Sequence, residues 1–330
     1  MNTSPLSRRA TLTCLGAATL LALAGPAPAQ TFPGKTVTLV VPFPAGGGPD
    51  LAARVLAEKI APKLGQAVVV DNKPGAGALL GAGQVARSPA DGHTLLFTPN
   101  TMVISPHVLA AGAGGNIDVH KDLVPVIAPA TTPMSLLAHP SLGVKNLKEL
   151  VEAAKKSPGI PYGTAGNGSP MHFAGEMFKQ SAKVDLLHVP YRGVAPSVTA
   201  ALGGEVKLLY VALGGALQHI KASKLVPLAL TEKSRSSLLP DLPTAAEQGF
   251  AGVEVNAWYG VFAPAGTPQA AIARINQEIN DALKLPEVRE KFTGAGLEVL
   301  GGTPQVLADF MKADNQRYGN IARELKIRAD

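Results

Sequence analysis

The residues best suited to chemistry in this chain are three successive glycines, Gly46 to Gly48, where an apolar run changes into an amphipathic pattern. Glycine has no Cβ, so neighbouring backbone N–H groups can converge on one spot. A helix that starts here adds unpaired amides and the positive end of its dipole. We call residues 42–48 the first glycine loop and predict that it holds an anion. No Gly-Lys-Ser/Thr follows, so the spacing of a nucleotide phosphate loop fails and a carboxylate fits better.

A second loop of this kind occurs further along the chain, at residues 164–169. It contains Gly166 and Gly168 and ends at Ser169-Pro170, where serine can cap a helix and proline can occupy its first position. We call it the second glycine loop. Either loop alone could be a tight connection between a strand and a helix. Two of them in a two-domain chain allow a cleft in which two helix N-termini meet one ligand.

Four single side chains have open alternatives. Asp50 either caps its helix and bonds the loop amides or contacts the ligand, and His172 either donates to a carboxylate or makes a local contact. Asn100 is a candidate for the lining of the cleft, and Trp258 fits a hinge or core aromatic better than a stacking platform. The histidines show no paired spacing for a metal, so we predict no metal site.

The order of elements indicates how these residues are positioned. Short β-rich apolar runs alternate with helical patterns, which is typical of an α/β protein with parallel strands. Strands are expected at residues 36–41, 67–70, 94–98, 186–189, 206–211 and 226–230. One helix is expected at 51–64, and Asn146 and Thr244 each begin a helix with the spacing of a capping box.

The first 29 residues have the pattern of an export signal. Arg8 and Arg9 precede an apolar run at residues 10–25, and residues 27–29 form an A-x-A cleavage site. A twin-arginine signal and an ordinary secretory signal both remain open. The apolar run is shorter than the ~20 residues that span a membrane. Cys14, the single cysteine, lies inside this segment, so the mature chain is expected to have no disulfide.

Composition limits the partners. Removal of Arg8 and Arg9 lowers the formal net charge from +6 to +4, and aromatic residues make up only 5% of the chain. No block of five or more like charges occurs, so the sequence does not favour nucleic-acid binding. A modest positive field favours small anions. The mature length exceeds what one core usually organises, so two domains are expected.

Eight segments together carry a family resemblance that covers essentially the whole mature chain in order. They are residues 43–50, 71–77, 88–96, 162–172, 188–193, 239–247, 258–260 and 263–268. In this combination they resemble the Bug-type receptors, which are also called the substrate-binding family of the tripartite tricarboxylate transporters.

The resemblance implies an α/β fold of the type II periplasmic binding proteins. Such a protein has two lobes, each with a mostly parallel sheet flanked by helices, joined by a two-strand hinge. Lobe one would comprise residues 30–128 and 256–330, and lobe two residues 129–255. The crossings would lie at residues 125–133 and 256–264 as adjacent extended segments.

The resemblance also implies a periplasmic, monomeric solute receptor without a cofactor. It would bind a small carboxylate in the cleft and deliver it to the membrane subunits of a transporter, or pass its liganded shape to the extracellular domain of a sensor. Tyr191 would lie near the cleft on lobe two. The residues that would line the anion end are Phe43, Ala45, Gly46, Gly47, Thr164, Ala165, Gly166, Asn167, Gly168 and Ser169.

Two departures from the family pattern bear on the ligand. Pro49 stands where Thr or Ser is usual, which removes one hydroxyl and one backbone donor. Leu209, Tyr210 and Val211 stand where a Phe-Asp pair is common, so an acid often present near the cleft is absent. An ammonium group would lack its counter-charge, which favours a plain or aromatic carboxylate over an amino acid.

Enzyme motifs fail at specific positions. A serine elbow, Gly-x-Ser-x-Gly, needs a glycine two residues before the serine and another two residues after it. Around Ser169 these positions hold Asn167 and Met171, so the motif is absent. Residues 75–81 have one residue too many for the dinucleotide fingerprint. We therefore predict a protein that is not an enzyme, with an exported α/β hydrolase or dehydrogenase as the alternative.

Overall fold

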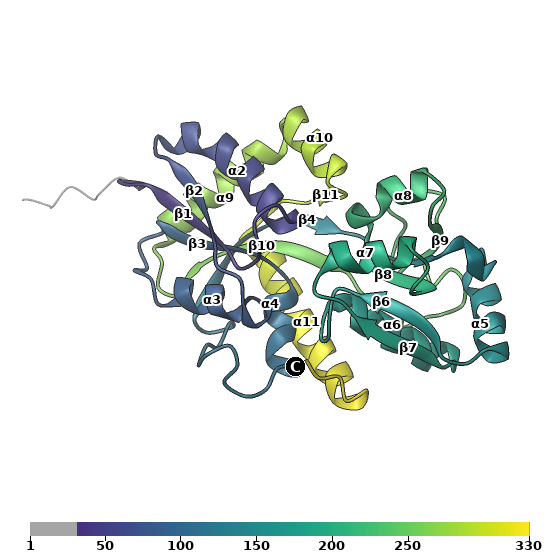
Figure 1. Ribbon diagram of the computed structural model, residues 1–330. Helices are drawn as coiled ribbons and strands as arrows, with labels where there is room; N and C mark the ends of the chain where they lie inside the picture. The colour runs from purple at the N-terminus through teal and green to yellow at the C-terminus, as the bar shows by residue number, and fades with distance from the viewer. Residues whose placement is uncertain (1–31, 330) are drawn as a thin grey trace, which may run out of the picture.

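Two sheets with helices on their faces organise the part of the chain that the structure, a computed structural model, describes, which is residues 32–329 (Figure 1). The predicted export signal lies outside these residues. We call the body around the six-stranded sheet the first lobe and the body around the five-stranded sheet the second lobe. Within residues 32–329, no helix combines the length and apolar character needed to cross a membrane.

The first lobe is built from both ends of the described chain. Its elements before the crossing are β1 (Val37–Val41), α2 (Gly48–Leu64), β2 (Val68–Asn72), η1 (Ala76–Ala78), α3 (Leu79–Ala86), β3 (Thr94–Pro99), α4 (Thr101–Val108) and β4 (Leu123–Thr132). Those after the return are β10 (Ala257–Pro264), α9 (Gln269–Leu283), α10 (Pro286–Gly294), β11 (Glu298–Val299) and α11 (Pro304–Glu324).

The second lobe is one continuous stretch of chain. Its elements are β5 (Met134–Ala138), η2 (Pro140–Leu142), α5 (Leu147–Lys156), β6 (Ile160–Thr164), α6 (Pro170–Ala182), β7 (Leu186–Pro190), α7 (Val194–Leu202), β8 (Leu208–Ala212), η3 (Leu213–Gly215), α8 (Leu217–Lys221) and β9 (Val226–Leu230).

Each sheet contains three parallel strands followed by antiparallel ones. The first sheet has the order β11-β4-β10-β3-β1-β2, and β3, β1 and β2 run parallel. The second has the order β7-β6-β8-β5-β9, and β7, β6 and β8 run parallel. The strands next to the crossing are antiparallel to their neighbours. The expected parallel arrangement therefore holds in the outer part of each lobe.

The predicted two-strand hinge is confirmed. Only Pro133 separates β4 of the first sheet from β5 of the second, and β10 pairs antiparallel with β4 from Ala257↔Thr132 to Pro264↔Leu123. On the return path, the Thr231 amide donates to the Met134 carbonyl at 2.9 Å. The two crossings are thus hydrogen-bonded neighbours at the base of both lobes.

Helix α11 contacts both lobes. It packs against β4 and α4 of the first lobe and against α6 of the second, and Figure 1 shows it in yellow below the junction. The Tyr318 ring meets the Phe173 ring of α6 edge-on, with centroids 5.0 Å apart. Tyr318 and Ala322 share one buried cluster with residues of the second sheet. The C-terminal part of α11 therefore adds to the core of the second lobe.

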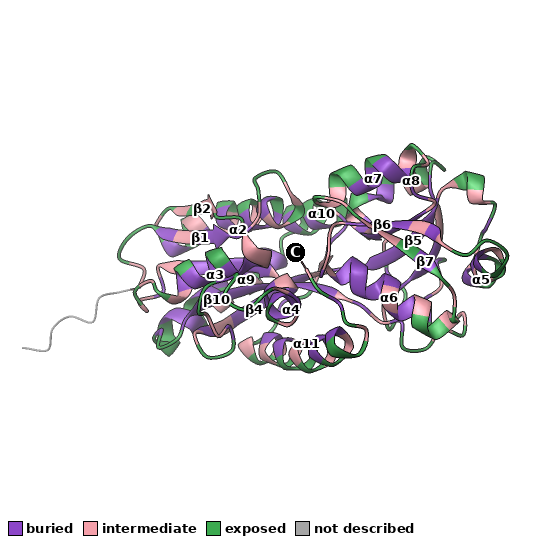
Figure 2. Ribbon diagram, turned by 60° about the horizontal axis from the view of Figure 1, so that its bottom comes forward, coloured by how far each residue is buried: buried purple, intermediate pink, exposed green. Residues whose placement is uncertain are grey.

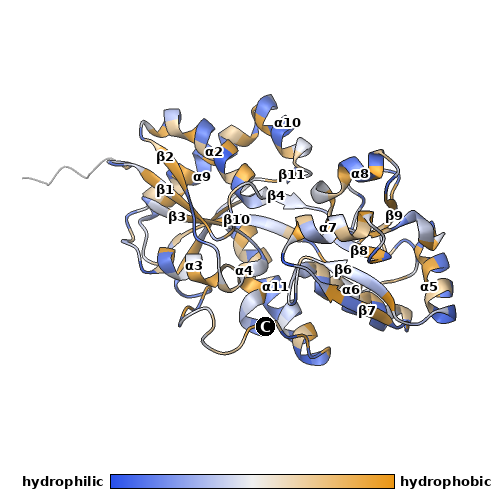
Figure 3. Cartoon of the chain, viewed as in Figure 1, coloured by the Kyte–Doolittle hydropathy of each residue, from blue (hydrophilic) through white to orange (hydrophobic). Residues whose placement is uncertain are grey.

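Burial follows the hydropathy of the strands. Figure 2 shows buried strands within both lobes and exposed outer faces on the helices, and Figure 3 shows that β1 and β2 are strongly apolar while the buried strands β6 and β10 are of intermediate hydropathy. Apolar and polar residues do not alternate along β1, because helices cover both faces of its sheet. Leu39 and Val41 face one apolar cluster and Val40 faces another. Apolar runs of this kind are typical of strands buried on both sides.

Two glycines bring the lobes into backbone contact away from the hinge strands. Gly214 lies in η3 of the second lobe and Gly296 precedes β11 of the first. A Cβ built on Gly214 would lie 2.1 Å from the carbonyl oxygen of Ala295, and one on Gly296 would lie 2.0 Å from the Cα of Gly214. Neither position has room for a side chain.

The prediction of a helix after Thr244 is wrong. The capping-box hydrogen bonds do form, because the Glu247 amide donates to the Thr244 hydroxyl at 3.1 Å and the Thr244 amide to Glu247 Oε2 at 2.7 Å. The segment continues only as turns, and Gly249 has a left-handed φ of 93°. The box after Asn146, in contrast, leads into α5.

Candidate functional site

The first glycine loop joins the carboxyl end of β1 to α2. Gly46 has a φ of 82°, in the left-handed region that favours glycine, and its amide donates to Asp50 Oδ2 at 2.8 Å. Gly47, the N-cap, has an extended backbone with φ −79° and ψ 168° and offers no side-chain cap. Of these two glycines, only Gly46 is required by its backbone conformation.

Asp50 holds this loop from the inside. It is 2% exposed, and Oδ2 also accepts from Arg54 Nε at 3.0 Å, while Oδ1 accepts from Asn72 Nδ2 at 2.9 Å. Burial raises the pKa of Asp50, but hydrogen bonds from Arg54, the Gly46 amide and Asn72 together lower it below its usual value. Of the two interpretations, the structure shows the loop-bonding one. Asn72 also donates to the Phe43 carbonyl at 3.0 Å.

The first turn of α2 leaves donors free. Among residues 32–329, the amides of Gly47, Gly48 and Asp50 find no acceptor, and Pro49 at the second helical position has no N–H. The loop around them is largely exposed, Gly48 included. In Figure 1 the carboxyl end of β1 lies toward the middle of the molecule. This end of α2 therefore presents unpaired N–H groups and a positive dipole end to solvent, as an anion site requires.

The second glycine loop uses its amides internally. Thr164 is fully buried, and its hydroxyl accepts from the Gly166 amide at 3.2 Å. The Gly168 amide donates to His172 Nδ1 at 3.2 Å. Ser169 caps α6 by accepting from the His172 amide at 3.3 Å and also donates to the Gly166 carbonyl at 2.7 Å. Few amides of this loop are left for a ligand.

A pair of histidines lies beneath the second glycine loop. The rings of His172 and His188 stack with centroids 3.8 Å apart, and His188 Nε2 lies 2.7 Å from the Thr164 hydroxyl. Burial lowers the pKa of His188 to about 3, and proximity to His172 adds to the effect. Burial also lowers the pKa of His172. His172, 8% exposed, accepts from the Gly168 amide through Nδ1, and its Nε2 lies 4.0 Å from Glu176 Oε1, so the structure shows local contacts on both ring nitrogens.

The connection after β7 lies beside the second glycine loop. The Tyr191 amide donates to the Thr164 carbonyl at 3.0 Å, and the Gly193 amide to the Ala165 carbonyl at 3.1 Å. Ala165, Asn167 and Tyr191 are half-buried. Burial raises the pKa of the Tyr191 phenol. The structure thus brings Tyr191 and the second glycine loop together, within the second lobe.

Asn100 requires a correction. It is fully buried at the amino end of α4, and Nδ2 donates to Asp314 Oδ2 and to the Asn256 carbonyl, both at 3.0 Å. Trp258 Nε1 donates to the same Asp314 oxygen at 2.9 Å. Asn100 therefore belongs to a network that joins β10 to α11 and does not line an open surface. Trp258, 1% exposed, is the core aromatic that was expected.

Tyr259 is a residue that sequence reasoning missed. It follows Trp258 on β10, and a Cβ built on Gly48 would lie 3.2 Å from its hydroxyl oxygen. Its hydroxyl therefore lies next to the free amides of α2. The only signal in the sequence was its place in the segment 258–260, in which only Trp258 was considered in the sequence analysis.

The second glycine loop also contacts the first lobe. A Cβ on Gly168 would lie 2.6 Å from Val108 Cγ2 at the end of α4 and 3.0 Å from the Cβ of Ala329. Gly168 has a φ of 69° as well, so both conformation and space demand glycine here. The loop is therefore fixed against the first lobe at this point.

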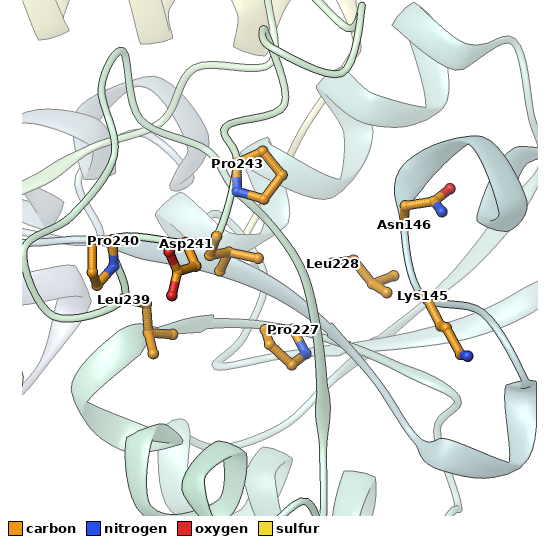
Figure 4. Close-up of a pocket in the computed structure, with 9 residues that line it drawn as sticks. Lys145, Asn146, Pro227, Leu228, Leu239, Pro240, Asp241 and Pro243 are labelled. Atoms are coloured by element: carbon orange, nitrogen blue, oxygen red, sulfur yellow. The ribbon is translucent and has the colours of Figure 1, made fainter.

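A separate hollow lies on the second lobe, with a volume of about 360 Å³ (Figure 4). No residue of either glycine loop lines it. Its walls are mostly leucine and proline: Lys145, Asn146, Pro227, Leu228, Leu239, Pro240, Asp241, Leu242 and Pro243. Within residues 32–329, no group of three or more His, Cys, Asp or Glu side chains could hold a metal ion.

Two lobes, each with its own sheet and joined by a paired-strand hinge, are the architecture of the two-lobed binding-protein fold. Comparison with known proteins agrees. Residues 52–327 match the family described as tripartite tricarboxylate transporter family receptor. The chain belongs to this receptor family.

Curated relatives match over nearly the full length. The "UPF0065 protein in tcbD-tcbE intergenic region" of Pseudomonas sp. (strain P51) is 37% identical over 307 residues, which cover 91% of this chain and 89% of that protein. The protein BugT of Bordetella pertussis is 34% identical over 305 residues, which cover 92% and 93%.

Solved structures share the fold. The periplasmic binding protein BugD superposes with a TM-score of 0.78 at 33% identity, over 91% of this chain and 100% of that one. Rhodopseudomonas palustris Rpa4515 with adipate gives 0.81 at 32%, over 90% and 99%. MatC from Rhodopseudomonas palustris with bound malate gives 0.77 at 31%, over 88% and 99%.

Proposed function

We propose that this protein is a periplasmic receptor that binds a small carboxylate between its lobes for delivery to a tripartite membrane transporter. The observation that carries the proposal is the set of unpaired amides at the amino end of α2, beside the exposed first glycine loop. Similarity to proteins whose structures hold adipate and malate supports a carboxylate. The proposal includes release of the solute unchanged, without catalysis.

The proposed lobe boundaries are those expected from the sequence, with residues 30–128 and 256–330 in one lobe and residues 129–255 in the other. The hinge at β4 and β10 would let the lobes close over the ligand. The second glycine loop, Tyr191 included, would approach the solute from the opposite side. The hydrogen bonds of the second loop are mostly internal. In this proposal the second loop therefore lines the opposite side of the binding site, while the first loop binds the carboxylate.

The proposed ligand class is a plain carboxylate. Tyr210, in the segment 209–211 where the family commonly has an acid, is 1% exposed in the core of the second lobe. It offers no charge to pair with an ammonium group. Charge-assisted hydrogen bonds to a carboxylate contribute about 1.5 to 3 kcal/mol each, so two or three free amides suffice for a specific anion site.

Calorimetric titration tests this function. Malate, adipate and their uncharged diamides would be added to the mature protein, and the solutes recovered afterwards would be analysed by NMR. We expect at least one acid to bind, its diamide to bind at least a hundredfold more weakly, and both to be recovered intact. Equal affinity for acid and diamide, or turnover of the solute, would contradict the proposal.

A further inference from the structure

The side chain of Tyr259 crosses from the hinge strand to the first glycine loop. Tyr259 pairs with Pro99 on β3 and with Ala130 on β4, near the carboxyl end of β3. Its ring stacks on Phe97 with centroids 5.7 Å apart and an interplanar angle of 21°. The strand therefore fixes the backbone and Phe97 fixes the ring, which leaves the hydroxyl little freedom of position.

The Tyr259 hydroxyl has no partner, unlike comparable tyrosines. The Tyr162 hydroxyl donates to Glu176 at 2.6 Å and the Tyr318 hydroxyl to a backbone oxygen at 3.4 Å. Tyr210 has an unpaired hydroxyl too, but that oxygen is sealed in the core. Among residues 32–329, the Tyr259 hydroxyl takes part in no side-chain hydrogen bond, and although the residue is only 6% exposed, its oxygen is not among the sealed unpaired atoms. A buried tyrosine usually has a partner for its hydroxyl.

The first turn of α2 lies beside the Tyr259 hydroxyl. A Cβ on Gly48 would stand 3.2 Å from the hydroxyl oxygen, closer than most carbon contacts allow. Gly48 is exposed, and its amide and those of Gly47 and Asp50 also lack acceptors within the described chain. One side-chain donor and several backbone donors are therefore unpaired in one place. Burial raises the pKa of the Tyr259 phenol, so the hydroxyl keeps its proton at neutral pH.

We infer that the Tyr259 hydroxyl donates a hydrogen bond to the carboxylate at the amino end of α2, and that Gly48 keeps the gap between them open. This inference rests on the proposed function and adds a side-chain donor to it. A hydroxyl held by a rigid strand has a fixed direction, whereas backbone amides accept an anion over a range of positions. Tyr259 would thus select carboxylates whose second oxygen lies toward β10.

A double-mutant cycle tests the inference with malate and adipate as probes. Tyr259→Phe should weaken binding of the acid by about tenfold, the usual consequence of losing one charge-assisted hydrogen bond. Gly48→Ala should weaken it too, because the methyl group displaces the hydroxyl. In the Tyr259→Phe background the alanine should cost clearly less, since the hydroxyl that it displaces is gone.

The matched control is Tyr210→Phe, which also removes an unpaired tyrosine hydroxyl but in the core of the second lobe, and it should leave affinity unchanged. Melting temperatures within about 2 °C of each other would show that all variants fold. Unchanged binding by Tyr259→Phe, while Gly47→Val weakens it at least tenfold, would overturn this inference alone. Failure of the unmodified protein to bind either acid would overturn the carboxylate assignment and this inference with it.

Discussion

The two glycine loops follow a parallel strand and lead into a helix with proline in its first turn, yet they use their amides in opposite ways. The first is held by a buried carboxylate, Asp50, and leaves the first amides of α2 unpaired. The second is held by neutral groups, Thr164 and His172, which bond the Gly166 and Gly168 amides. Asp50 is paired with Arg54 and bonds only the Gly46 amide, which leaves the first amides of α2 without an acceptor, whereas Thr164 and His172 occupy two amides of the second loop. Similar sequence patterns therefore give one candidate binding surface and one wall.

The largest expected effect comes from breaking the hydrogen bonds that Asp50 makes behind the first loop. Asp50→Asn replaces an oxygen that accepts from Gly46 and Arg54 with an NH₂ group or breaks the bond from Asn72. We expect the free energy of unfolding to fall by about 2 to 3 kcal/mol and carboxylate affinity to fall about a hundredfold. Urea unfolding and calorimetry measure the two quantities.

The matched change in the second loop is Thr164→Val, which removes an acceptor but no charge. Stability should fall by only about 1 to 2 kcal/mol, and affinity should change by less than Asp50→Asn changes it. Asp309→Asn on the exposed face of α11 serves as a surface control and should change neither. Equal losses of affinity from the two loop variants would remove the proposed difference between the loops.

Covering the amides without disturbing the loop sharpens the comparison. A Cβ on Gly47 would meet Pro44 O at 3.6 Å and Pro49 Cδ at 3.8 Å, both ordinary contacts, and its φ suits any residue. Gly47→Val should therefore leave the melting temperature almost unchanged while it weakens carboxylate binding about ten- to hundredfold. Gly294→Val, at an exposed glycine with open space, is the control. Full affinity in Gly47→Val would mean that the first loop is only a turn.

The neutral histidines predict a pH dependence of stability. The pKa of His188 is about 3 in the folded protein and about 6.5 in the unfolded chain, so between these values the unfolded state binds more protons. Stability should fall as the pH drops below 6.5, by at most about 1 kcal/mol between pH 6.5 and 5.5, and by less in proportion to the partial exposure of the ring. Chemical unfolding of the wild type and His188→Gln at both pH values isolates the effect, because every other group titrates in both.

The exposed residue His120 provides the control for this measurement. The variant His120→Gln should keep the wild-type dependence of stability on pH. A His188→Gln variant whose stability falls as steeply as that of the wild type would show that the second loop is not supported by a neutral histidine.

The smallest effect is expected at the helix cap. Ser169→Ala removes the acceptor for the His172 amide, which should cost about 1 kcal/mol of stability. Carboxylate affinity should change less than threefold, because the other bonds of the second loop remain. Asn146→Ala, which removes the cap of α5, should cost a similar amount and leave affinity intact. A tenfold loss of affinity in Ser169→Ala would place the ligand at the second loop instead.

The local parts of this architecture could be read from the sequence. The strands at residues 94–98 and 226–230 and the helix after Asn146 depend on neighbours within a few positions, and they lie where they were expected to within a residue or two. Thr244 shows the limit of this approach. Its capping bonds form as the motif predicts, but Gly249, five residues further on, has a positive φ and the chain bends away.

The roles of Asn100 and Tyr259 depend on long-range contacts. Asn100 meets Asp314, which lies 214 positions further along the chain, and no local pattern indicates that contact. Tyr259 approaches Gly48 only because β10 inserts between β3 and β4. The antiparallel insertion of the returning strand beside the parallel ones thus decided which polar residues lie in the core and which reach the first loop.

The contact between Gly214 and Gly296 limits how closely the two lobes can approach each other. Main-chain atoms meet there with no side chain between them that could rotate or yield, and packed protein atoms are nearly incompressible. The lobes can approach no further at this point. Any further closure must therefore be a rotation with this contact as its pivot. A single methyl group on either glycine would act as a wedge, holding the lobes apart by roughly its own thickness and widening the angle between them at every point beyond.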